Sequence, residues 1–106
     1  MELGDLIKML EAADPDMVVP NGFNHPHSYR GYYHELAFEP AQNVTVREML
    51  EAAKGAVGTT YEGWKGGDFT MQEYSDCWLS EEGRAGGETL SAPLLGYLLD
   101  EAERAR

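Results

Sequence analysis

Residues 21–40 read N-G-F-N-H-P-H-S-Y-R-G-Y-Y-H-E-L-A-F-E-P, and this stretch concentrates the chemistry of the chain. It holds all three histidines, three of the six tyrosines, two of the three phenylalanines and one arginine. Polar and aromatic loops carried on a rigid scaffold are where binding function usually lies. The sequence therefore predicts a small-ligand site in this stretch, with the remaining residues as its scaffold.

Three helices are predicted around this stretch. In residues 2–13, apolar side chains recur at three- and four-residue spacing, which is typical of an amphipathic helix. Thr45 and Glu48 have the spacing of a capping box, which predicts a helix from there to about Val57. Ser91 is a natural N-cap residue and begins a last apolar-faced helix.

The segments between the helices predict short strands. Turn residues after position 19 and Pro40 are expected to end the first two of them. The expected strands cover residues 16–19, 34–38, 59–62, 69–80 (as two short strands or one bent strand) and 88–90. Together with the helices they predict an α+β fold with a small, mainly antiparallel sheet and about three helices, forming a single domain over residues 1–106.

The composition of the chain limits the kinds of molecule that it is expected to bind and the compartment where it is expected to act. The net charge of -11 argues against a nucleic-acid polymer, because phosphate contacts require a basic surface. The single cysteine, Cys77, excludes an intrachain disulfide and agrees with a reducing cytoplasm. The sequence shows no signal peptide and no apolar run long enough for a membrane span, so a cytoplasmic protein is expected. A domain this small also favours a homo-oligomer.

Three of the eight cationic residues stand beside glycine, at Arg30, Lys65 and Arg84. A phosphate site needs cations and a close backbone approach, which glycine permits, although glycine beside a cation is also common in surface turns. Aromatic residues nearby could stack a purine ring. The predicted ligand-binding residues are Arg30, Lys65 and Arg84 for phosphates, Tyr29, Tyr32, Trp64 and Phe23 for stacking, and Asn21, His27 and Ser28 for hydrogen bonds to ribose or phosphate.

The sequence gives weaker evidence for metal binding or catalysis. His25, His27 and His34 could bind a metal with a nearby carboxylate, but the proline between the first two bends the chain, and neither a metal nor a cofactor is predicted. Cys77 is expected to be buried and therefore inert as a nucleophile. No catalytic residue is predicted.

The motif P-H-S-Y-R-G-Y-Y-x-x-L-A-F-E-P (residues 26–40), the capped helix T-V-R-E-M-L-E-A-A (45–53) and the segment Y-E-G-W-K-G-G-D-F-T-M (61–71) resemble a family of small bacteriophage and prophage proteins. The resemblance spans about residues 3–87. It implies a phage origin and expression in the host cytosol, and it carries no catalytic residue to this chain. Phage proteins of this size are often counter-defence factors, and one class, the nucleotide sponges, withholds signalling nucleotides from host immune effectors.

Three functions follow as expectations. The first is a homo-oligomeric protein that sequesters a nucleotide-derived immune signal, such as a cyclic ADP-ribose isomer or a cyclic oligonucleotide, without catalysis. The second is an acidic inhibitor that binds to a basic surface of a host defence protein. The third is an enzyme that cleaves such a nucleotide with His27 or His34 as general acid or base.

Overall fold

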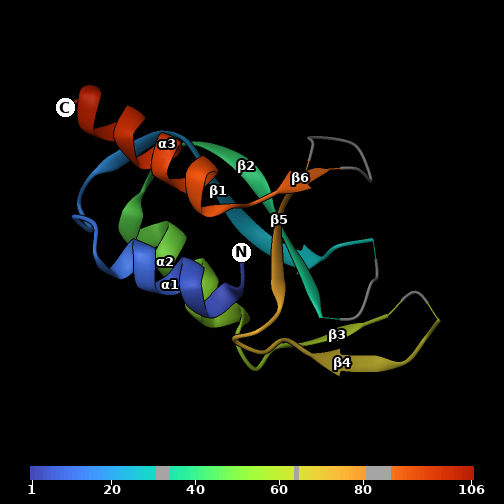
Figure 1. The fold of residues 1–106 in the computed structure, drawn as a ribbon. Helices are drawn as coiled ribbons and strands as arrows, with labels where there is room; N and C mark the ends of the chain where they lie inside the picture. The colour runs from blue at the N-terminus through green and yellow to red at the C-terminus, as the bar shows by residue number, and fades with distance from the viewer. Residues whose placement is uncertain (31–33, 64, 81–86) are drawn as a thin grey trace.

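Two long antiparallel strands, β1 (Val18–Ser28) and β2 (Glu35–Thr45), form the centre of the fold (Figure 1). The computed structural model describes residues 1–30, 34–63, 65–80 and 87–106. β5 (Asp76–Ser80) pairs with β2 in parallel, and β6 (Gly87–Thr89) pairs with β5 antiparallel. The sheet order is therefore β1-β2-β5-β6.

A separate two-stranded sheet consists of β3 (Thr60–Glu62) and β4 (Asp68–Thr70). In Figure 1 this hairpin lies at the opposite end of the molecule from the C-terminus. The predicted α+β class is confirmed, with a sheet that is mixed but mostly antiparallel.

The three predicted helices are confirmed as α1 (Leu3–Glu11), α2 (Val46–Ala56) and α3 (Ala92–Arg104). The Thr45 hydroxyl accepts the Glu48 amide hydrogen at 3.1 Å and begins α2, while the Ser91 hydroxyl accepts the Leu94 amide hydrogen at 3.2 Å and begins α3. The second half of the predicted capping box differs. The Glu48 carboxylate accepts a hydrogen bond from the Thr45 hydroxyl at 3.2 Å instead of reaching back to the backbone amide.

The predicted ends of the first two strands are wrong, because neither proline stops its strand. Pro20 lies within β1, which is an edge strand, so its missing amide hydrogen costs no ladder bond on the free side. Pro40 lies within β2 and pairs with Phe23. β5 pairs with β2 only as far as Phe38, so beyond that residue β2 is itself an edge on that side. Both strands run on for several residues past the expected stops.

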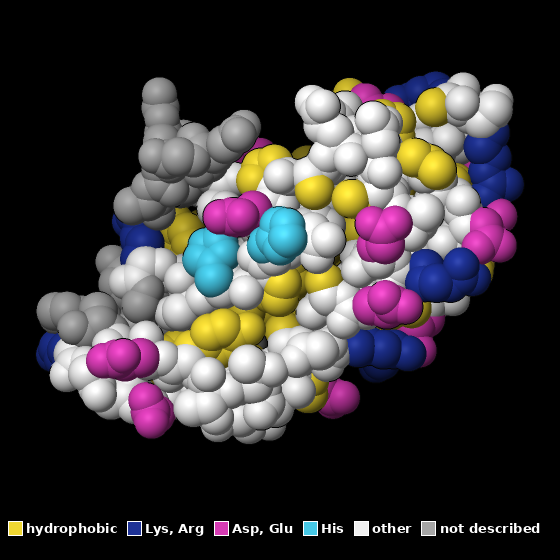
Figure 2. Space-filling model, turned by 180° about the vertical axis from the view of Figure 1, so that it is seen from behind, with side chains coloured by type: hydrophobic (Ala, Val, Ile, Leu, Met, Phe, Trp, Pro, Cys, Tyr) yellow, Lys and Arg dark blue, Asp and Glu magenta, His cyan; other side chains and the backbone are white. Residues whose placement is uncertain are grey.

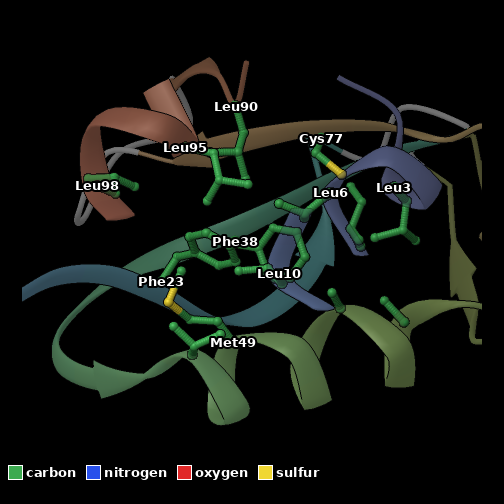
Figure 3. Close-up of a cluster of buried hydrophobic side chains, with 14 of the residues drawn as sticks. Leu3, Leu6, Leu10, Phe23, Phe38, Met49, Cys77, Leu90, Leu95 and Leu98 are labelled. Carbon is green, nitrogen blue, oxygen red and sulfur yellow. The ribbon is translucent and has the colours of Figure 1, made fainter. Parts of the chain in front are cut away.

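The helices and the sheet enclose one hydrophobic core (Figure 3). Phe23 and Phe38 lie at its centre with ring centroids 4.8 Å apart, between Met49 of α2 and Leu95 of α3. Leu10 is one of the α1 side chains in the same core. Burial of these side chains provides the main stabilisation of the fold.

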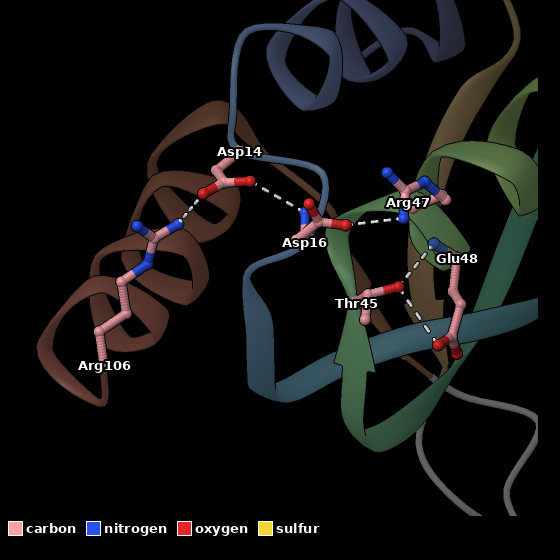
Figure 4. A network of polar contacts seen from close by, with 6 residues as sticks. All are labelled: Asp14, Asp16, Thr45, Arg47, Glu48 and Arg106. Carbon is pink, nitrogen blue, oxygen red and sulfur yellow. Dashed lines mark hydrogen bonds and ion pairs between the residues drawn. The ribbon is translucent and has the colours of Figure 1, made fainter.

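A chain of polar contacts joins the segment after α1 to both other helices (Figure 4). The Asp14 carboxylate accepts hydrogen bonds from the Asp16 amide at 2.9 Å and from Arg106 at 2.5 Å, and the Asp16 carboxylate accepts one from Arg47 at 2.7 Å. The Asp16 amide and, next, Arg106 lower the pKa of the Asp14 carboxyl. The side chains of these ion pairs are exposed to solvent, so the pairs contribute little to the stability of the fold. Within the described part of the chain, no helix has the length and hydropathy needed to cross a membrane.

Candidate functional site

A stack of two aromatic rings lies where β1 ends. Tyr29 follows β1, and its amide donates a hydrogen bond to the Glu35 carbonyl at 2.9 Å, which continues the pairing with β2. Its ring is stacked on Trp78 of β5, with centroids 4.4 Å apart and planes 5° from parallel. Two rings distant in sequence are thereby held as one rigid surface, the Tyr29–Trp78 stack.

The register of the sheet explains why these rings meet. His27 lies opposite Ala37 in β2, and Ala37 lies opposite Trp78 in β5. Leu36 and Cys77, one residue earlier in each strand, belong to the core, so Ala37 and Trp78 point to the other face. Because Ala37 is small and lies in β2 between β1 and β5, it leaves room on this face for the two rings.

Arg30 lies over the stack. Its guanidinium carbon is 5.5 Å from the centroid of the Tyr29 ring, within cation–π range, and the side chain is exposed. The backbone at Arg30 has a φ of 55°, a left-handed conformation that turns the chain out of the strand. This turn places a cation beside the rings at the edge of the site.

Two buried polar atoms, one in β1 and one in β5, have no hydrogen-bond partner among the residues that the structure describes. They are the hydroxyl oxygen of Ser28 and the indole nitrogen of Trp78. Buried polar groups in proteins are nearly always paired, with protein or with ordered water. An unpaired donor at each position is therefore available to a bound water or to a polar group of a ligand.

A bulge in β1 brings histidines to the same region. The register with β2 shifts between Asn24 and His27, and His25 has a φ of 50°. The ring of His27 makes a hydrogen bond through Nδ1 with the His25 carbonyl at 3.2 Å. Figure 2, which shows the molecule from behind, has histidine side chains next to acidic and hydrophobic ones.

The third histidine is directed elsewhere. His34 packs against Phe69 and Tyr74, with ring centroids 6.0 Å and 5.5 Å away. In the described ranges, no group of three or more His, Cys, Asp or Glu side chains could hold a metal ion.

The structure brings together three of the predicted ligand-binding residues, His27, Tyr29 and Arg30, whereas Ser28 lies opposite Leu36 and faces the core side of the sheet. Tyr29 is only 6% exposed, because Trp78 covers one face of its ring. No signal in the sequence indicated that Trp78 would be the stacking partner of Tyr29.

Two other predicted residues, Phe23 and Asn21, lie apart from the stack. Phe23 is fully buried and packs on Phe38, so it has no ring face to offer a ligand, and the prediction that it stacks a base is corrected. Asn21 lies on the other half of β1 and donates from Nδ2 to the Glu101 carboxylate of α3 at 2.9 Å. Lys65 is exposed in the turn between β3 and β4. Tyr32, Trp64 and Arg84 lie outside the described residues.

Cys77 is buried in the core behind the stack. Its burial raises the pKa of the thiol to about 12. The thiol is therefore protonated at neutral pH and is a poor nucleophile there.

Comparison with known proteins adds no identity to this geometry. No family model, curated protein or solved structure matches the chain.

Proposed function

We propose that this protein binds a small nucleotide-type ligand at the Tyr29–Trp78 stack and holds it without chemical change. The observation that carries the proposal is the Arg30 guanidinium, 5.5 Å from a ring that is itself stacked flat on a second ring. The guanidinium can pair with an anionic phosphate, and a planar base can stack on the half-buried ring of Trp78, because Tyr29 itself is only 6% exposed.

The neighbouring polar atoms extend the same chemistry. The Trp78 indole nitrogen is a buried donor, and a ribose hydroxyl or a phosphate oxygen is a suitable acceptor for it. His27, which is partly buried and lies on the same face of the sheet, can donate a further hydrogen bond. A buried donor that lacks a partner favours ligands with oxygens at defined positions over purely apolar ligands.

The net charge of the chain favours a small ligand over a long polyanion. At a net charge of -11, a long polyanion such as DNA or RNA would be repelled, whereas one or two phosphates beside Arg30 would meet a local cation. Cyclic ADP-ribose isomers and cyclic oligonucleotides combine few phosphates with planar bases. In view of the resemblance to small phage proteins, we propose sequestration of such a signal from a host defence system as the biological role.

The test is a retention assay with a mass balance. The protein is incubated with a panel of cyclic dinucleotides, cyclic trinucleotides and cyclic ADP-ribose isomers, filtered and heated, and the released compound is identified by mass spectrometry. We expect one class to be retained and released with unchanged mass. A changed mass would instead establish cleavage, with His27 as the first residue to test.

Two variants locate the site in the same assay. Arg30→Gln should weaken retention at least about tenfold, because a hydrogen bond to a charged group contributes about 1.5–3 kcal/mol. Arg47→Gln is the matched control, because it also removes one exposed cation, which pairs only with Asp16 among the described residues. Equal affinity of the two variants would contradict the proposed site.

A further inference from the structure

A groove on a different part of the molecule lies between α3 and the strands β1, β2, β5 and β6. Its volume is about 550 Å³, which is within the range of small-molecule and side-chain pockets. The residues that line it include Asn21, Gln42, Leu79, Glu88, Leu94 and Tyr97. Leu79 packs against the core, whereas Trp78, its neighbour in β5, points to the other face, so the groove and the Tyr29–Trp78 stack lie on opposite faces of the sheet.

The walls of the groove combine an apolar surface with an exposed aromatic ring. Leu79 and Leu94 are partly buried against the core and supply the apolar part. Tyr97 is 57% exposed, although it projects from a helix that buries three of its other side chains. An exposed aromatic side chain beside apolar residues is characteristic of a contact point for a partner.

The polar groups of the groove are acceptors and anions. Glu88 contributes a carboxylate from β6. The Asn21 amide donates to Glu101 at 2.9 Å, which orients that amide and leaves its carbonyl oxygen as an acceptor. The described lining contains neither Lys nor Arg. A cation with an apolar stem is the complement of this surface.

We propose that the groove receives an arginine side chain from a basic protein partner. The planar guanidinium can stack on Tyr97 while it donates in bidentate fashion to Glu88. Its three methylene groups match the apolar wall formed by the leucines. The net charge of -11 attracts a basic protein surface over a longer range and repels nucleic acid. This partner site is additional to the nucleotide site and does not depend on it.

The test is an NMR titration of the isotope-labelled protein with the tripeptide acetyl-Gly-Arg-Gly-amide. The matched ligand replaces arginine by citrulline, which has nearly the same shape and no charge. We expect the arginine peptide to shift the amide signals of Gln42 and Tyr97 in a saturable way, and to bind at least fivefold more tightly than the citrulline peptide. Absence of saturation, or equal binding of the two peptides, would overturn the proposal.

Variants separate a specific site from general attraction by the acidic surface. Glu88→Gln and Tyr97→Leu should each weaken the arginine peptide by about two- to fivefold. Glu51→Gln removes the same charge from an exposed position on α2 and should change the affinity by less than the Glu88 variant does. An equal loss of affinity with Glu51→Gln would overturn the proposal. It would also be overturned if the signals of Gln42 and Tyr97 shifted with protein concentration in the absence of peptide, because the groove would then be occupied by a second copy of the chain.

Discussion

At the scale of single residues, the alternation of side chains along the strands gives the sheet one face that packs into the core and another that bears the Tyr29–Trp78 stack. Leu36 and Cys77 point into the core, whereas Ala37 and Trp78, each one position later, point away from it. Tyr29 can stack on Trp78 because the Ala37 side chain between them, on β2, is short. The chemistry of the site therefore follows from the alternation of the strands.

The buried thiol of Cys77 gives a prediction about alkaline stability. The pKa of the thiol is raised from 9.0 to about 12 in the folded protein by burial. Between these values the unfolded chain loses a proton that the folded protein keeps, so the contribution of Cys77 to stability is complete below pH 9 and is lost as the pH rises toward 12. The free energy of unfolding should fall by up to about 1.4 kcal/mol per pH unit in this window from this group alone.

Urea unfolding measured from pH 8 to pH 11 checks this expectation against Cys77→Ala. The variant should be less stable at pH 8, because it leaves a small cavity, but its stability should depend less on pH than that of the parent. Parallel pH profiles for the two proteins would show that the thiol is not the titrating group.

At the scale of elements, close contact between α2 and the β1–β2 pair holds the scaffold of the site. Gly22 of β1 is the point of closest approach. A Cβ atom there would lie 2.4 Å from Cγ2 of Val44 and 3.0 Å from the sulfur of Met49. Gly22→Ala should therefore lower the free energy of unfolding by about 1–3 kcal/mol through overpacking.

Two further variants test whether that loss comes from the clash. In a Val44→Ala background the same substitution should cost clearly less, because the nearest atom has been removed. Gly55→Ala in α2 meets nothing within 4 Å and should stabilise the protein by up to about 1 kcal/mol through helix propensity. Strict additivity of the Gly22 and Val44 changes in urea unfolding would contradict the packing argument.

The helices were predictable from the sequence, because their spacing and caps are local signals. The lengths of β1 and β2 were not, because whether Pro20 or Pro40 ends a strand depends on which neighbour pairs at that position. The cluster of His27, Tyr29 and Arg30 was predictable because its members are close together in the chain. The role of Trp78 and the burial of Phe23 depend on sheet register, which no short stretch of sequence records.

At the scale of the whole molecule, β1 connects two regions of different chemistry. One end of the strand leads to the Tyr29–Trp78 stack with its cation, and the half that bears Asn21 contributes to an acceptor-lined groove beside α3. We propose that the first region binds a small anion and the second a basic side chain. The strand is held rigid between them by its pairing with β2.

The central claim, that a nucleotide binds at the Tyr29–Trp78 stack, is tested most directly by the fluorescence of Trp78. The chain has two tryptophans, so Trp64→Phe leaves Trp78 as the reporter and keeps an aromatic ring at position 64. Titration with the nucleotide retained in the filtration assay should change the Trp78 emission with the midpoint found by retention, and Arg30→Gln should move that midpoint at least about tenfold higher. Retention of a nucleotide with unchanged Trp78 emission, or no retention of any member of the panel, would contradict the account.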